Sequence, residues 1–259
     1  MRPLAGITLC RETDLMTTRY DTIGLNYADL RQPDPRIAAA IEDALGPAQT
    51  VMNIGAGAGS YEPADRAVTA VEPSIEMIRK RRSSANKVVQ ASADDLPFED
   101  DAFDAAMAVL TVHHWPDKEA GLREVRRVTR GRIVIVTFDP SRRPWLTDYL
   151  PGLAALDEAQ MPTMSDYARW LGPVRVMPLL VPHDCTDGFL YAYWRRPEAY
   201  LDAHVRSGSS SFWVIHDVDS GLQALARDLA TGEWQRRYAD LLALNAYDAG
   251  YRIVLADGV

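Results

Sequence analysis

Hydrophobic and polar positions along the chain follow two alternating patterns. Short, nearly continuous apolar runs lie at residues 51–54, 67–71, 87–91, 105–110 and 132–138, and stretches with helical spacing separate them. Continuous apolar runs of this length are typical of parallel strands that helices cover on both faces. The pattern therefore predicts a doubly wound, mostly parallel α/β sheet.

Two of the intervening segments carry signals of helix boundaries. In PDPRIAAAIEDALG, residues 33–46, Asp34 can cap a helix whose first position is a proline. In DKEAGLREVRRVTRG, residues 117–131, Asp117 precedes an apolar face of helical spacing, and a glycine closes the segment. We expect the first helix to lead into the first strand and the second to connect two parallel strands.

The alternation is interrupted after residue 140. We expect helices through about 144–171, a strand near 174–181, a long aromatic-rich segment over 186–249, and a last strand at YRIVLA, residues 251–256. The segment before the last strand is far longer than an ordinary connection. It should therefore carry its own helices and form a lid that governs the choice of substrate.

Composition narrows the possible partners. The 259 residues carry a formal net charge of −8, which argues against a nucleic-acid partner. No apolar segment approaches the ~18 residues of a membrane span. Cys10 and Cys185 have neither metal-ligand spacing nor the pattern of a disulfide framework. We expect a cytoplasmic monomer or homodimer with no metal, no nucleic-acid partner and no membrane partner.

Glycines gather directly behind the first apolar run. VMNIGAGAGSYEP, residues 51–63, contains Gly55, Gly57 and Gly59. In a doubly wound sheet the turn after the first strand faces the ligand crevice, and glycine there lets the backbone approach a ligand closely. The same residues also suit a tight strand-to-helix turn that binds nothing.

An acidic residue ends the second apolar run. Glu72, in AVEPS, follows Gly55 by seventeen residues and can accept hydrogen bonds from both hydroxyls of a ribose. This favours an adenosine-type ligand. Because the glycine spacing is GxGxG rather than GxGxxG, and no arginine follows Glu72, NADP is disfavoured and the case for NAD is weakened.

Four separated motifs together resemble a known family. VMNIGAGAGSYEP, AVEPS, ASADDLPFEDDAFDAAMAVLTVHHWPD and RIVIVTF are similar in order and spacing to the class I S-adenosylmethionine-dependent methyltransferases of the type-11 small-molecule kind. The resemblance covers about residues 20–140. It implies a Rossmann-like sheet of seven strands with the last one antiparallel, S-adenosylmethionine as methyl donor, S-adenosylhomocysteine as product, and a small-molecule acceptor.

The pattern along the chain, together with the resemblance, predicts a domain organisation. The expected parts are an N-terminal arm over residues 1–15, a cofactor-binding core over 16–140, lid and substrate-binding elements over 141–249, which include the strand near 174–181, and the last core strand within 250–259.

Cofactor contacts follow from the resemblance, position by position. Gly55, Ala56, Gly57 and Gly59 would surround the amino acid end of the cofactor, and Glu72 would hold the ribose. The remaining contacts would be Pro73, Ser74 and Met77 on the adenine side, Ser92, Ala93 and Asp94 near the adenine amine, Val109 and Leu110 beside the methionine moiety, and Tyr20, Tyr27 and Arg31 on a segment that folds over the cofactor, with Arg31 toward its carboxylate.

Some of these positions depart from the family pattern or have a simpler explanation. Asn53 and Ser92 stand where the family commonly has aspartate, which puts in doubt a charge at 53 and the usual adenine contact at 92. Arg31 also fits an ordinary solvated arginine.

Histidines that follow the fourth apolar run, residues 105–110, are candidates for general acid–base catalysis. Methyl transfer from a sulfonium needs mainly positioning and exclusion of water, and a general base is optional. His113 and His114 would lie on the rim of the crevice, and in an extended chain only one of them would face it. His183 and Asp184 form a second candidate pair. Packing or loop hydrogen bonds are the alternative for both pairs.

The predicted lid is rich in aromatic residues. They either form a wall around a flat or cationic acceptor or make up the core of the lid itself. Two other functions stay open at this point, an NAD-binding oxidoreductase and a catalytically silent S-adenosylmethionine-binding regulator. The aromatic residues concerned are Phe189, Tyr191, Tyr193, Trp194, Phe212 and Trp213.

Overall fold

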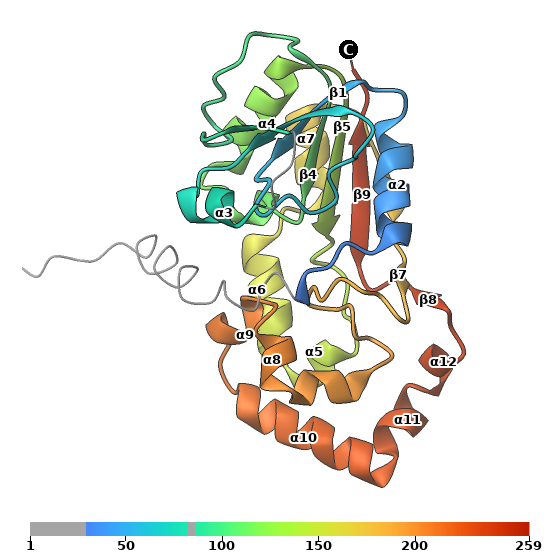
Figure 1. Cartoon of the computed structure of the whole chain (residues 1–259). Coiled ribbons are helices and arrows are strands. Elements are labelled where there is room, and N and C mark those ends of the chain that lie inside the picture. Colours follow the sequence, from blue (N-terminus) through green and yellow to red (C-terminus); the bar gives the residue numbers. More distant parts are fainter. Residues whose placement is uncertain (1–29, 82–85, 259) are drawn as a thin grey trace, which may run out of the picture.

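A central sheet lies above a helical part that is built largely from the second half of the chain (Figure 1). The computed structural model describes residues 30–81 and 86–258. Tyr20, Tyr27 and the predicted arm over residues 1–15 lie outside the described residues. No helix in these ranges combines the length and the apolar character that crossing a membrane requires.

Within the described ranges, seven strands form the sheet in the order β3-β2-β1-β4-β5-β9-β6. Strands β1 to β5 are parallel, and β9 is antiparallel to both of its neighbours, so the predicted fold class is confirmed. The bounds are β1 Thr50–Ile54, β2 Ala67–Val71, β3 Lys87–Val89, β4 Phe103–Val109, β5 Thr129–Phe138, β6 Val174–Pro178 and β9 Tyr251–Ala256.

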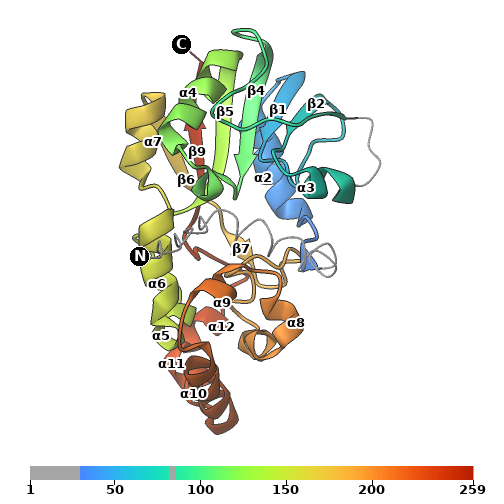
Figure 2. The same ribbon diagram turned by 90° about the vertical axis from the view of Figure 1, so that its left-hand side faces the viewer.

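Helices cover both faces of this sheet (Figure 2). Helix α2 (Pro35–Leu45) packs with Val51 on one face, while α4 (Lys118–Val128) packs with Met52 on the other, as the alternation of side chains along β1 requires. The predicted caps are confirmed, since Asp34 accepts from the Arg36 amide and Asp117 from the Ala120 amide. Helices α3 (Ile75–Lys80) and α7 (Met164–Leu171) complete the upper half.

Burial of apolar side chains holds α4 in place. Leu122, Val125 and Val128, the face predicted from the spacing, are at most 1% exposed. Each such burial stabilises the fold by about 1.5–3 kcal/mol.

The helical part lies beneath the carboxyl ends of the parallel strands (Figure 1). The strand predicted over 174–181 is divided, because β6 ends at Pro178 and Val181–Pro182 (β7) pairs instead with Ala246–Tyr247 (β8). The elements of this part are α5 Leu146–Tyr149, α6 Pro151–Gln160, the 3-10 helix η2 Pro197–Leu201, α8 Ala203–Arg206, α9 Ser211–Val214, α10 Val218–Thr231, α11 Glu233–Arg237 and α12 Ala239–Leu242.

Candidate active site

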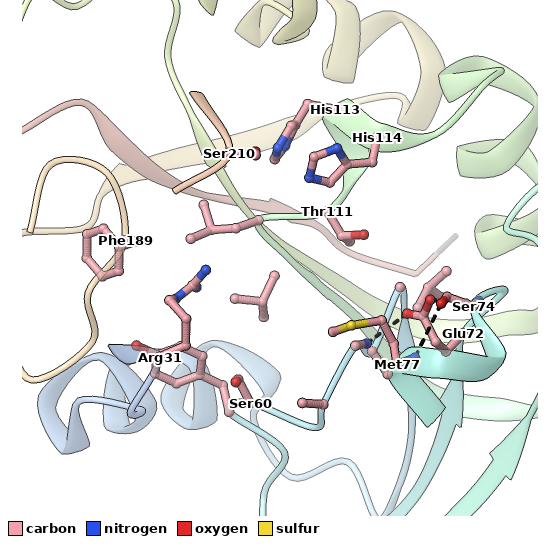
Figure 3. Close-up of a pocket in the computed structure, with 18 of the residues that line it drawn as sticks. Arg31, Ser60, Glu72, Ser74, Met77, Thr111, His113, His114, Phe189 and Ser210 are labelled. Carbon is pink, nitrogen blue, oxygen red and sulfur yellow. Dashed lines mark hydrogen bonds between the residues drawn. The ribbon is translucent and has the colours of Figure 1, made fainter. Parts of the chain in front are cut away.

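A cavity of about 840 Å³ opens between the carboxyl ends of the strands and the helical part. Its volume is within the range of small-molecule sites. Figure 3 shows Glu72, Ser74 and Met77 at one end, Phe189 and Arg31 toward the other, and the histidine turn between them. The cavity therefore combines predicted cofactor residues with residues of the later chain.

The glycine loop lines this cavity, and its three glycines meet different requirements. All three have positive φ, at 64° for Gly55, 52° for Gly57 and 91° for Gly59. A Cβ on Gly55 would lie 2.0 Å from Thr111 Oγ1, and one on Gly59 would lie 3.2 Å from the Arg81 guanidinium. A Cβ on Gly57 would meet only Met77 Cε, at 3.5 Å, among the described residues. The missing side chain at Gly57 therefore leaves pocket space, whereas Gly55 and Gly59 accommodate protein neighbours.

Glu72 is fixed at the end of β2 by the loops beside it. Its side chain is buried, and its two carboxylate oxygens accept separately from the Gly57 amide at 2.8 Å and the Ser74 amide at 2.9 Å (Figure 3). A carboxylate oxygen has a second lone pair, so each can accept one more hydrogen bond. The carboxylate is thus oriented in advance for a ligand with two neighbouring hydroxyls.

Most predicted cofactor residues border the cavity. Asp94 is exposed and, within the described chain, is not among the lining residues; it accepts a hydrogen bond from Ser92 Oγ. The lining residues of the predicted set are Arg31, Gly55, Ala56, Gly57, Gly59, Glu72, Pro73, Ser74, Met77, Ser92, Ala93, Val109 and Leu110.

A buried polar network that the motifs do not predict supports the glycine loop. The Asn53 side-chain amide donates to Glu62 at 2.9 Å, and Arg81 pairs with both oxygens of Glu62 at 2.7 and 2.8 Å. The side chains of Arg81 and Glu62 are only 5% and 6% exposed. Arg81 also donates to the Gly57 carbonyl at 3.3 Å. Asn53 stands where the family commonly has aspartate, and the carboxylate of Glu62 lies beside it.

Arg31 borders the cavity but already has a carboxylate partner. Its Nε lies 2.6 Å from Asp187 Oδ1, and Asp187 also accepts from the Tyr61 hydroxyl at 2.8 Å. Burial and the nearby Asp187 raise the pKa of Tyr61, so it stays a neutral donor. Binding of a cofactor carboxylate by Arg31 stays a prediction, and such binding would share the guanidinium with Asp187.

The histidines do not continue the strand. Val112–His114 forms a 3-10 turn, so the expectation of an extended chain with one histidine facing away is wrong. Both rings border the cavity, with centroids 3.9 Å apart. The short turn presents successive side chains to the same side.

Both imidazoles are neutral at neutral pH. Burial lowers the pKa of His113 well below its ordinary value, and the charges of Lys118 and Arg31 lower it further. Desolvation by the surrounding chain and the charge of Lys118 lower the pKa of His114 to about 4, although His114 is an exposed residue. Each ring can therefore accept a hydrogen bond without first losing a proton.

The second candidate pair lies elsewhere. Asp184 is exposed and pairs with Arg36 at 2.7 Å, and the His183 amide donates to the Asn245 carbonyl at 3.0 Å. Neither residue borders the cavity as residues 30–81 and 86–258 define it. The structure therefore does not bring His183 and Asp184 to the histidine turn, and the loop contacts account for them.

The aromatic residues lie at different places around the cavity. Phe189, Tyr191 and Trp213 border it, and Phe189 and Tyr191 are also buried in the hydrophobic core. Contact of these rings with an acceptor stays a prediction. Trp194 instead belongs to the core of the helical part, where it is 1% exposed, accepts from Trp145 Nε1 through its carbonyl and donates to the Val181 carbonyl. Tyr193 and Phe212 are likewise not among the lining residues in the described part of the chain.

Asp157 is a pocket residue that the sequence motifs do not single out. It lies on α6, is 3% exposed, and accepts from the Tyr191 hydroxyl at 2.8 Å. Burial raises its pKa to about 6. The sequence holds one indication that Asp157 is unusual. It follows Leu153, which is fully buried, by four residues, so an acidic residue stands on the apolar face of the helix.

The fold and the cavity define an α/β protein whose glycine loop and fixed carboxylate suit an adenosine-type ligand. Residues 52–135 match the family described as "Methyltransferase domain". A solved structure from Anabaena variabilis, described as a proposed methyltransferase from an antibiotic biosynthesis pathway, is 36% identical, covers 88% of this chain and 99% of its own, and superposes with a TM-score of 0.82. This chain belongs to the class I S-adenosylmethionine-dependent methyltransferases.

Curated relatives match over shorter lengths. The uncharacterised protein YafE of Escherichia coli is 31% identical over 44% of this chain and 59% of its own length. Demethylmenaquinone methyltransferase of Renibacterium salmoninarum is 28% identical over 68% of this chain and 77% of its own length. The chain thus spans little more than half the length of YafE. The matched region covers a larger share of the demethylmenaquinone methyltransferase.

Replacing Glu72 with alanine should weaken binding of S-adenosylhomocysteine by about 1.5–3 kcal/mol, or roughly 10-fold to 150-fold, because it removes a charged acceptor. Isothermal titration calorimetry measures the change. Glu76→Ala is the matched control, since Glu76 lies on α3, has a half-exposed side chain and pairs with Arg79. Equal affinities for the Glu72 variant and the wild type, both folded, would contradict the assignment.

Proposed function

We propose that this chain transfers the methyl group of S-adenosylmethionine to a small-molecule acceptor, of the kind made in specialised metabolism. The observation that carries the proposal is the continuity of one cavity, which is lined both by the glycine loop with Glu72 and by Phe189 and Tyr191. The named relatives support a small acceptor, because one is described from an antibiotic pathway and another is named for demethylmenaquinone.

The residues present fit the cofactor that the family uses. Gly57 leaves space where a side chain would fill the pocket, and Glu72 keeps a hydrogen-bonding position on each oxygen. When bound, the cofactor supplies a methyl group already activated on a sulfonium. The chain needs no metal to activate that group, and its task is to place the acceptor and to exclude water.

The chain's own residues divide that task. Glu72 and the space left open at Gly57 would hold the cofactor end, and the apolar side chains at the Phe189 end would exclude water from the acceptor. His113 and His114, neutral and in contact with the cavity, can accept a proton from an acceptor hydroxyl or amine as it becomes methylated.

Isotope-labelled methyl transfer tests this function. The protein is incubated with S-adenosylmethionine that carries a labelled methyl group and with a metabolite extract, and the products are read by mass spectrometry. We expect labelled products that are absent when Gly57→Val replaces the wild type. Binding of the cofactor without any labelled product would support the silent regulator, and thermal stabilisation by NAD alone would support the oxidoreductase.

A further inference from the structure

A second polar centre lies in the cavity, apart from the glycine loop. We call it the Asp157 chamber, and its residues are Phe138, Asp157, Phe189, Tyr191 and Tyr251, all of which border the cavity. Their rings are in contact, with centroid distances of 5.0 Å for Phe138–Tyr191, 5.5 Å for Phe138–Tyr251 and 4.7 Å for Phe189–Tyr251. One cavity thus brings together a cluster of four aromatic rings and a buried carboxyl group, which is bonded to the Tyr191 hydroxyl.

The charge of this carboxyl is not balanced by the part of the chain that the structure describes. Tyr191 donates to Asp157 Oδ2, but Oδ1 accepts no hydrogen bond there. No lysine, arginine or histidine of residues 30–81 and 86–258 forms an ion pair with Asp157. Arg143, whose charge lowers the pKa of Asp157, is 41% exposed and pairs with Glu158. A buried carboxylate without a cation is unfavourable unless a ligand supplies one.

We infer that the acceptor carries a protonated amine, which pairs with Asp157 among the rings of the Asp157 chamber. The inference rests on the proposed function and names its substrate class. An ammonium group suits both parts of the chamber, because it donates hydrogen bonds to a carboxylate and is attracted to the faces of aromatic rings. Asp157 is then a specificity-determining residue, and Tyr191 positions it.

The protonation state of Asp157 agrees with this role. Burial raises its pKa to about 6, while the Tyr191 hydrogen bond and the charge of Arg143 act in the opposite direction. Tyr191 and Tyr251, the other titratable groups of the chamber, have their pKa values raised by burial and stay neutral, although the charge of Arg31, which borders the same cavity, lowers the pKa of Tyr251. At pH 7.5 the carboxyl is therefore ionised, and at pH 5 it is mostly protonated and loses its attraction for a cation.

Calorimetry with two probes of matched shape tests the inference. The whole protein, saturated with S-adenosylhomocysteine, is titrated with 2-phenylethylamine and with 2-phenylethanol, in which a hydroxyl replaces the ammonium. We expect the amine to bind at least about tenfold more tightly at pH 7.5. We also expect the preference to decline by about tenfold at pH 5, as Asp157 becomes neutral.

Two variants test whether the preference for the amine comes from Asp157 or from the net negative charge of the protein. Asp157→Asn should abolish the preference for the amine and leave the affinity for S-adenosylhomocysteine unchanged. Glu158→Gln, the next residue on α6, is the matched control and should keep the preference. The pH comparison on the wild type needs no variant, so it stands even if Asp157→Asn does not fold.

Three outcomes would overturn the inference: equal affinities for the two probes, tighter binding of the alcohol, or no binding of either. Affinity for S-adenosylhomocysteine is measured first, in the same preparation. Absence of that binding would count against the proposed function, whereas cofactor binding without a preference for the amine counts against the amine alone.

Discussion

Gly57→Val should reduce the affinity for S-adenosylhomocysteine by more than about 100-fold while the sheet stays folded. A Cβ at this position meets only Met77 Cε, at 3.5 Å, among the described residues, so the added side chain extends into pocket space. The positive φ of 52° is also unsuited to a β-branched residue. Because the Gly57 amide donates to Glu72, a shift of this backbone would disturb the carboxylate as well. Calorimetry measures the affinity, and circular dichroism checks the fold.

Gly172→Val is the matched control for backbone strain. Gly172 ends α7 with a φ of 81°, and a Cβ added there would have nothing within 4 Å among the described residues. This variant should lower Tm in the same way yet bind S-adenosylhomocysteine normally. If Gly57→Val keeps wild-type affinity, the glycines serve only the turn.

His113→Asn should lower kcat by about 10²-fold or more once the labelled-methyl experiment has supplied an acceptor. His113 borders the cavity near Ser210, on the side of the helical part (Figure 3). Its ring is neutral and can accept the acceptor's proton, but its lowered pKa makes it a weak base, so an effect at the lower end of the usual range is expected. The affinity for the cofactor should change little.

The pH profile of kcat adds an independent check. Because the pKa values of His113 and His114 are lowered, both rings keep their neutral form as the pH falls from 8 to 6, and kcat at saturating acceptor should stay level. His204→Asn, on the exposed surface of α8, is the control and should behave as wild type. An unchanged rate in His113→Asn would leave proximity as the main catalytic device.

The architecture of the upper half follows from local signals. Asp34, Asp117 and the buried face of α4 act through short-range hydrogen bonds and periodic burial, which a linear sequence displays directly. Strand boundaries are harder to predict from local sequence. After β6 the chain leaves the sheet, and its next strand, β7, pairs with Ala246–Tyr247, some 65 residues further on.

In the candidate site, too, positions set by neighbouring residues could be predicted, and positions set by distant parts of the chain could not. The position of Glu72 at the cavity could be predicted because this residue follows the second strand immediately. The turn at Val112–His114 depends on how the chain packs after β4, so alternation gave the wrong expectation for the histidines. Asp157 meets Tyr191 across 34 positions, and no spacing rule connects them. Contacts of this kind become visible only when the chain is folded.

The cavity is shared unequally between the two halves of the sequence. The glycine loop and Glu72 come from one short stretch, residues 53–72, whereas Phe138, Asp157, Tyr191 and Tyr251 come from widely separated segments. Substitutions in those later segments can alter the proposed acceptor side without touching the loop that we propose binds the methyl donor. A lineage built on this plan can therefore diversify its acceptors while it inherits the donor site unchanged.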